Sequence, residues 1–195
     1  MPDDVTRLTA ALLRPERPSS DYDLNPGILL PEGRNLRAAA VLVAVTEQGR
    51  LILTKRASGL AHHPGQIAFP GGKVDAGDAG PEAAALREAR EEIGLPEASV
   101  QVLGRLAGHE TVTGFQITPV VCVVRRAFVP VAEAGEVDEV FTVPLTHVLD
   151  PARYRIERRR WRGAWRRYYA VPYGPYYIWG ATARILRGLA DRAGP

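Results

Sequence analysis

Hydrophobic positions recur along this chain at two different spacings, which together predict a mixture of helices and strands. Leucines at helical spacing predict a helix that begins near Asp3 or Asp4 and runs to about Arg14. Short apolar runs rich in β-branched residues predict strands. These runs are 38–45, 51–54, 100–106, 115–124 and 139–143, and the first two flank a polar turn that suggests pairing.

The segment 81–93 has the clearest helix boundaries in the chain. Pro81 suits the first helical position, Gly94 suits a left-handed stop, and Pro96 prevents continuation. We therefore predict a helix over 81–93.

Toward the carboxyl end, the segments 154–161 and 165–171 predict a hairpin that turns at Arg162-Gly163. An amphipathic helix is predicted over 178–191. Three further segments have loop composition: 15–33, 56–65 and the break Pro70-Gly71-Gly72.

Length and composition limit the class of protein. The chain has 195 residues, 46% hydrophobic and 24% charged, as expected of one folded domain. We divide it into an amino-terminal helix and arm, 1–35, and a main domain, 36–195. No apolar run approaches the ~18 residues of a transmembrane helix. The acidic start lacks a signal peptide and Cys122 is the single cysteine, so we expect a cytoplasmic protein.

Charge is unevenly distributed along the chain. The formal net charge is +3, but the residues from Pro151 onward contain 11 Arg and only two acids. A basic segment of this kind could serve nucleic acid, a membrane surface or an anionic small substrate.

Three acidic side chains share one side of the predicted helix. Glu88, Glu91 and Glu92 stand at i, i+3 and i+4, so we expect them to converge on one spot. We expect Ala83, Leu86, Ala89 and Ile93 to face the core, and the small Ala84 and Ala85 to leave space beside the carboxylates. Repulsion among the acids costs ~0.2–0.5 kcal/mol per pair. Mg²⁺ or Mn²⁺ would offset it better than Zn²⁺, because the donors are oxygens.

These residues also form part of a longer pattern. Gly72, Asp78 and the run 87–95, REAREEIGL, resemble the Nudix box of Nudix hydrolases, G-x5-E-x7-R-E-U-x-E-E-x-G-U, where U is bulky and aliphatic. Ala89 is small for U. Asp78 stands where the family usually has Glu, with one extra residue before Arg87, which leaves the role of Asp78 open.

A second resemblance narrows the substrate. The segments 53–58 and 60–72 are similar to the stretch that marks coenzyme A pyrophosphatases within the Nudix group, as are 136–145 and 178–186 downstream. The resemblance implies an α/β fold, a Nudix-type α/β/α sandwich with a mixed β-sheet. It also implies hydrolysis of the diphosphate bond of coenzyme A to adenosine 3',5'-bisphosphate and 4'-phosphopantetheine, with Mg²⁺ or Mn²⁺ as cofactor.

The same resemblance implies roles for individual residues. Glu88 and Glu92 would be metal ligands, Glu91 a third ligand or water-orienting base, and the Gly72 carbonyl a further ligand. Arg87 would hold Glu91 in place.

The remaining candidate residues are those for the general base and for contacts with the substrate. The general base could be a box glutamate, Glu136 or Glu139. The expected substrate contacts are Lys55, Arg56, His63 and Lys73.

Two alternatives stay open at this stage. Another nucleoside diphosphate, such as ADP-ribose, could be the substrate. The arginines and aromatics of 153–169 could instead form a nucleic-acid-binding module, although we favour a solvated ribbon there. We expect a small-molecule partner and no membrane partner; the sequence leaves the oligomeric state open, with a homodimer among the options.

Overall fold

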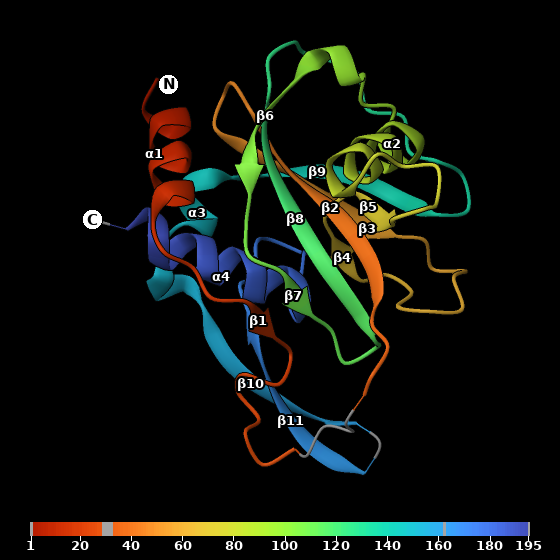
Figure 1. Cartoon of the computed structure of the whole chain (residues 1–195), viewed down its shortest axis with the longest axis vertical. Coiled ribbons are helices and arrows are strands. Elements are labelled where there is room, and N and C mark those ends of the chain that lie inside the picture. Colours follow the sequence, from red (N-terminus) through yellow and green to blue (C-terminus); the bar gives the residue numbers. More distant parts are fainter. Residues whose placement is uncertain (1, 29–32, 162, 195) are drawn as a thin grey trace.

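A mixed β-sheet lies at the centre of this computed structural model, which describes residues 2–28, 33–161 and 163–194. Helices cover both faces of the sheet (Figure 1), so the predicted α/β/α sandwich is confirmed. The helices are α1 (Pro2–Leu13), α2 (Pro81–Ile93), α3 (Leu145–Val148) and α4 (Ala181–Ala193). The strands of the sheet are β1 (Ser19–Ser20), β2 (Arg37–Thr46), β3 (Arg50–Arg56), β4 (Ile67–Ala68), β5 (Gly71–Lys73), β6 (Val100–Arg105), β7 (His109–Glu110), β8 (Phe115–Val124) and β9 (Val137–Pro144).

The longest pairing joins β2 and β8, which run parallel over ten residues. On one side, β6 and β7 pair with β8, and the short β1 extends the sheet from β7. On the other side, β2 and β3 pair at Val45 and Leu51 and then diverge, while β3 continues against β9 and β4. The predicted pairing of these two strands is therefore confirmed only next to their turn.

Strand β5 occupies the gap where β2 and β3 diverge. It pairs with β2, with Gly72 opposite Ala40 and Gly71 opposite Val41. Gly71 has φ 152°, and a Cβ there would lie 2.4 Å from the Ala40 carbonyl oxygen, so a side chain is excluded. The predicted break at Pro70-Gly71-Gly72 is wrong in part, because the glycines that suggested it allow close strand pairing.

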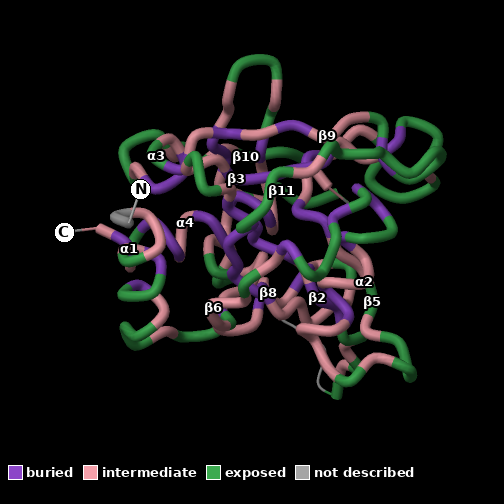
Figure 2. The backbone as a smooth tube through the Cα atoms, turned by 90° about the horizontal axis from the view of Figure 1, so that it is seen from above, coloured by how far each residue is buried: buried purple, intermediate pink, exposed green. Residues whose placement is uncertain are grey.

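The alternation of side chains along β2 divides the core into two layers. Val43 and Val45 pack on the face that carries α1 and α4, whereas Leu42 and Ala44 pack on the face that carries α2. Figure 2 shows the central strands as the most buried part of the chain.

A separate two-stranded hairpin, β10 (Arg155–Trp161) and β11 (Ala164–Ala170), extends beyond the sheet (Figure 1). Its strands agree with the predicted hairpin, and Arg162 in the turn lies outside the described residues.

The amino-terminal arm is joined to the sheet by side-chain hydrogen bonds. His109 is fully buried, and its Nδ1 lies 2.9 Å from Ser19 Oγ and its Nε2 3.2 Å from Asp21 Oδ1. Asp21 also accepts a hydrogen bond from the Val112 amide. The segment 15–33 was predicted as a loop, but it contains the short strand β1. Residues 29–32 of this segment lie outside the described residues.

Helix boundaries show which local signals were sufficient. Helix α2 has the predicted bounds, and its stop is Gly94 with φ 68°. Helix α4 begins at Ala181, three residues later than predicted. Helix α1 begins at Pro2, so Asp3 and Asp4 lie within its first turn instead of preceding it.

Candidate active site

Helix α2 packs on β2 and β5 with a different side inward from the one we predicted. Ala84 and Ala85 are fully buried together with Ala89 and Ile93, whereas Ala83 and Leu86 are only partly buried. The alanines therefore bring the helix close to the sheet and leave no space beside the carboxylates. This rotation turns Glu88 and Glu92 toward the glycines of β5.

Glu92 lies beneath the helix and is 5% exposed. Its Oε2 accepts a hydrogen bond of 3.0 Å from the Gly71 amide. Burial raises the pKa of Glu92 to about 7; the Gly71 amide and Arg56 oppose this shift, and repulsion from Glu88 and Glu136 adds to it. A buried carboxylate with a raised pKa favours a cation beside it.

Glu88 lies against the neighbouring glycine. A Cβ on Gly72 would be 2.5 Å from Glu88 Cδ, so the carboxylate occupies the space that a side chain would fill. Loss of hydration raises the pKa of Glu88, although Arg87 acts in the opposite direction.

Arg87 connects Glu88 and Glu91 to the loop before the helix. It makes two hydrogen bonds of 2.9 Å to Asp78, whose pKa is lowered by them. Its Nη1 donates to both Glu88 and Glu91 at 3.0 Å. Asp78, which departs from the Nudix box, thus anchors the arginine.

The carboxylates of Glu88, Glu91 and Glu92 do not surround a single position. The side chain of Glu91 is half exposed and bonded to Arg87. Within the described ranges, no group of three acidic, His or Cys side chains surrounds a single point closely enough to hold a metal ion. Arg87 Nη1 lies 3.0 Å from an oxygen of both Glu88 and Glu91, so these two carboxylates meet at the arginine, whereas Glu92 accepts a hydrogen bond from the Gly71 amide. A shared metal site of all three glutamates stays a prediction.

The donors that remain nevertheless fit a hard divalent cation. Glu88 and Glu92 supply oxygens beside the glycines, their charges repel one another, and both pKa values are raised. A cation would relieve this repulsion, and Mg²⁺ and Mn²⁺ accept such oxygen-rich sets.

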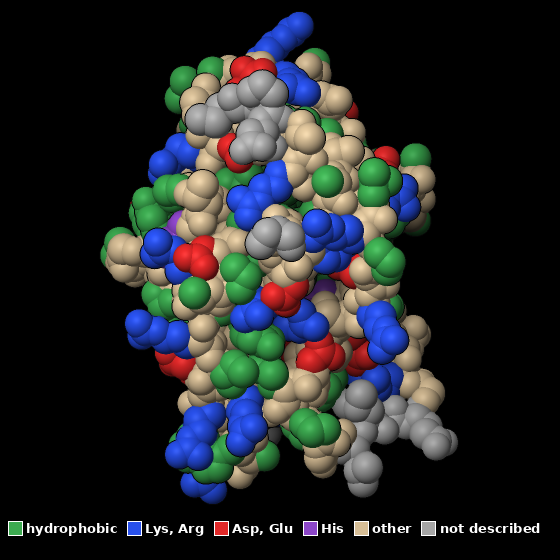
Figure 3. Space-filling view, turned by 90° about the vertical axis from the view of Figure 1, so that its left-hand side faces the viewer, with side chains coloured by type: hydrophobic (Ala, Val, Ile, Leu, Met, Phe, Trp, Pro, Cys, Tyr) green, Lys and Arg blue, Asp and Glu red, His purple; other side chains and the backbone are tan. Residues whose placement is uncertain are grey.

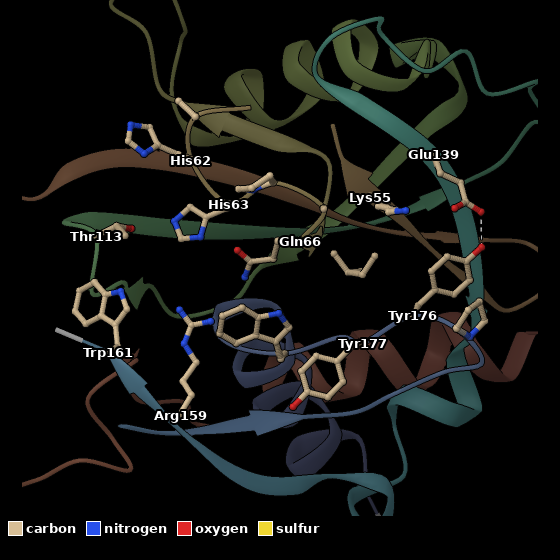
Figure 4. Close-up of a pocket in the computed structure, with 16 residues that line it drawn as sticks. Lys55, His62, His63, Gln66, Thr113, Glu139, Arg159, Trp161, Tyr176 and Tyr177 are labelled. Atoms are coloured by element: carbon tan, nitrogen blue, oxygen red, sulfur yellow. Dashed lines mark hydrogen bonds between the residues drawn. The ribbon is translucent and has the colours of Figure 1, made fainter. Parts of the chain in front are cut away.

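A large cavity is lined by Lys55, near the end of β3, and by residues of the loop that follows. Its volume is about 920 Å³, which is ample for a nucleotide-sized ligand. It is lined by Lys55, Ala61, His62, His63, Pro64, Gly65, Gln66, Ile67, Thr113, Glu139, Arg159, Trp161, Pro175, Tyr176, Tyr177 and Trp179. Figure 4 shows Lys55, Glu139 and Tyr176 at one end and His62, His63 and Trp161 toward the other.

The predicted substrate contacts fall into three places. Lys55 and His63 line the cavity. Arg56 is the last residue of β3, next to Lys55; its charge lowers the pKa of both Glu92 and His63, and its buried Nε has no hydrogen-bond partner among the described residues. Lys73 is exposed on β5, outside the cavity wall, and its carbonyl accepts a hydrogen bond from Arg87.

The structure also separates the two candidate bases outside the box. Glu136 is solvent-exposed, and its charge raises the pKa of both Glu88 and Glu92. Glu139 instead faces the cavity, opposite Lys55 in the β3–β9 ladder, and accepts a hydrogen bond from the Tyr176 hydroxyl.

Sequence reasoning missed the hairpin as part of the cavity. Arg159 and Trp161 of β10 form one wall, and Tyr177 and Trp179 continue it. The alternation of Arg159 and Trp161 at i and i+2 was the available signal, because it places both on one side of the ribbon. The opposite side is solvated as predicted, with Trp165 61% exposed.

A mixed sheet lies between helical layers, and a carboxylate-bearing helix packs on a glycine strand near a large cavity. This arrangement defines an α/β/α sandwich with a candidate cation-binding site. Residues 35–163 match the family profile described as the NUDIX domain. The chain therefore belongs to the Nudix hydrolase family.

Two related proteins agree with this assignment. A protein of Enterobacter sp. called an uncharacterized Nudix hydrolase NudL is 46% identical over 162 residues, 82% of this chain and 84% of that protein. A protein of the same description from Citrobacter koseri is 45% identical over 165 residues, 84% and 86% of the two chains. A solved Nudix hydrolase of M. smegmatis, RenU, is 27% identical and covers 57% of this chain and 71% of that chain, with a TM-score of 0.45.

The family membership establishes a hydrolase that acts on nucleoside diphosphate derivatives, and members of this family generally use divalent cations. Among the described residues, none of the helices has the length and apolar character needed to span a membrane.

Proposed function

We propose that this protein hydrolyses the diphosphate bond of coenzyme A to adenosine 3',5'-bisphosphate and 4'-phosphopantetheine, with Mg²⁺ or Mn²⁺. The observation that carries the proposal is the place of the segment that resembles coenzyme A pyrophosphatases. Eight of the 16 residues that line the cavity fall within 55–67, inside that segment. The part of the sequence that suggested the substrate is therefore also the part that would contact it.

Different residues of the site would bind the diphosphate and the cation. Arg56 and Lys55 would bind the diphosphate. The buried Nε of Arg56, which has no partner in the described part of the chain, and the neighbouring ammonium of Lys55 both prefer phosphate oxygens. Glu88, Glu92 and the Gly72 carbonyl would hold the cation. When bound, that cation supplies a Lewis acid that offsets negative charge on the diphosphate.

We assign the proton-accepting role to Glu136. It is accessible to water and close enough to Glu88 and Glu92 to influence both, whereas Glu91 is bonded to Arg87 and Glu139 to Tyr176. Glu136 would take a proton from the attacking water. Arg87 would act as a positioning residue that holds Glu88.

The alternative reading as a nucleic-acid-binding module is less well supported. Arg159 and Trp161 of the hairpin line the cavity instead of an open stacking surface. Over the middle of the face that carries α1 and α4, basic and acidic side chains are interspersed (Figure 3), whereas nucleic acid favours a continuous basic surface. A small-molecule substrate remains our proposal, and the protein would work in the cytoplasm.

The test is an assay of coenzyme A and ADP-ribose with Mg²⁺ or Mn²⁺ and with EDTA, followed by identification of the products. We expect adenosine 3',5'-bisphosphate and 4'-phosphopantetheine from coenzyme A, and none with EDTA or with Glu88→Gln or Glu92→Gln. Turnover of ADP-ribose without turnover of coenzyme A would reject the proposal.

A further inference from the structure

Arg159 lacks an acidic partner among the described residues, unlike Arg184 and Arg187 of α4. Arg184 and Arg187 are paired with Asp23 and Asp191. For Arg159 no ion pair occurs within the part of the chain that the structure describes, and its guanidinium lies 4.5 Å from the centre of the Trp179 ring. A cation held by an indole and lacking a carboxylate keeps its hydrogen-bond donors available to a ligand.

The surroundings of Arg159 within the cavity are basic and aromatic. Figure 4 shows Arg159 reaching from β10 toward His63 and Gln66, with Trp161 beside it. Glu139, the acidic residue of the cavity wall, lies at the far end with Tyr176. The end near Arg159 therefore favours an anion.

His63 adds a single hydrogen-bond donor at this end without adding a charge near neutral pH. Loss of hydration lowers the pKa of His63, and the charges of Arg56, His62 and Arg159 lower it further. The permanent positive charge at this end therefore comes from Arg159.

Lys55 and Arg159 line opposite ends of the cavity (Figure 4). A diphosphate bound by Lys55 and its neighbour Arg56 would therefore leave Arg159 available for a second, separate phosphate.

We propose that Arg159, with His62 and His63, binds a phosphomonoester on the ribose of the nucleoside half of the substrate, and so makes the hairpin a specificity element. This inference rests on the proposed function, because coenzyme A carries such a 3'-phosphate in addition to its diphosphate. ADP-ribose lacks it. The basic hairpin thus serves a small anionic substrate, and its Arg and Trp residues form a wall of the cavity.

The test compares coenzyme A with 3'-dephospho-coenzyme A, which has the same diphosphate and lacks only the monoester. We expect wild-type kcat/KM to be at least about 10-fold higher for coenzyme A. Arg159→Gln should lower it about 10-fold or more for coenzyme A and less than about 2-fold for the dephospho compound. Arg159→Lys should retain part of the preference. The matched control is Arg158→Gln on the outward side of the same strand, where the guanidinium lies over Trp165. This variant should leave kcat/KM unchanged for both substrates.

A binding measurement makes the two proposals separable. Calorimetry on the full chain should show adenosine 3',5'-bisphosphate binding more tightly than AMP, and Arg159→Gln should remove that difference. If coenzyme A is not hydrolysed but this difference is found and depends on Arg159, the proposed function fails and the subsite stands. If coenzyme A is hydrolysed and Arg159→Gln reduces both substrates equally, Arg159 contacts the diphosphate and the subsite is rejected.

Discussion

The carboxylate of Glu88 occupies the space where a side chain on Gly72 would stand, with 2.5 Å between Glu88 Cδ and the position of that absent Cβ. The helix and the glycine strand thus fit together only because Gly72 has no side chain. The two glycines of the sequence motif have separate steric roles, because Gly71 allows close pairing with β2 and Gly72 admits the carboxylate of Glu88.

Gly72→Ala should therefore displace Glu88 and lower kcat about 100-fold, since misplacement by ~1 Å at a reacting centre can have that effect. The backbone of Gly72 tolerates alanine, so the thermal unfolding midpoint should change much less than the activity does. Gly77→Ala is the control, because a Cβ there meets no atom within 4 Å. Equal activity of the two variants would mean that the position of Glu88 is unimportant.

Arg87 and Asp78 should behave as a positioning pair. Asp78→Asn removes the charge that holds the guanidinium, so Glu88 loses its fixed partner. We expect kcat to fall about 10-fold while KM stays within about 2-fold, and the metal concentration for half-maximal activity to rise. If KM rises and kcat does not change, Arg87 contacts the substrate.

The role of Glu136 can be separated from those of Glu91 and Glu139 by three single Gln variants. Loss of a general base typically costs 10²–10⁴ in rate. We expect that loss in kcat for Glu136→Gln, a smaller loss for Glu91→Gln, and an effect mainly on KM for Glu139→Gln, which lines the cavity. The largest kcat loss in Glu91→Gln would assign the base to the box instead.

The sequence predicted what depends on neighbouring residues and missed what depends on distant ones. The bounds of α2 were predictable because Pro81 and Gly94 act locally. The inward side of α2 was not, because it is decided by β2 and β5, and neither Ala84 nor Ala85 differs from Ala83 as a residue type. The alternation of Arg159 and Trp161 could place both on one side of the ribbon, but it could not show that this side lines the cavity with His63, because that depends on how the hairpin packs against a distant loop.

Burial of Glu92 should make the metal-free protein less stable at high pH. Its folded pKa of about 7 exceeds the ordinary value of 4.5, so between these values the folded state binds more protons than the unfolded state, and stability falls as pH rises. In EDTA at pH 8, Glu92→Gln should unfold at a higher temperature than wild type. Its free energy of unfolding should exceed that of wild type by about 1–3 kcal/mol. The gap should narrow at pH 5.5, where the wild-type carboxyl is protonated. A gap that is independent of pH would mean that Glu92 is not the source.

His109 should contribute more to the stability of the arm than to catalysis, because its buried ring bonds both Ser19 and Asp21. His109→Leu leaves both partners without the ring nitrogens, which should cost about 1–3 kcal/mol of unfolding free energy. Asp21→Asn should cost less, since an amide oxygen can still accept from the Val112 amide. Because the two residues share a hydrogen bond, the double variant should be less destabilised than the sum of the single variants, by at least about 0.5 kcal/mol.

The measurement is chemical unfolding of the full chain, with kcat for the proposed substrate recorded in parallel. Strict additivity would show that His109 and Asp21 stabilise the arm independently, and a large kcat loss at unchanged stability would place them in the catalytic site instead.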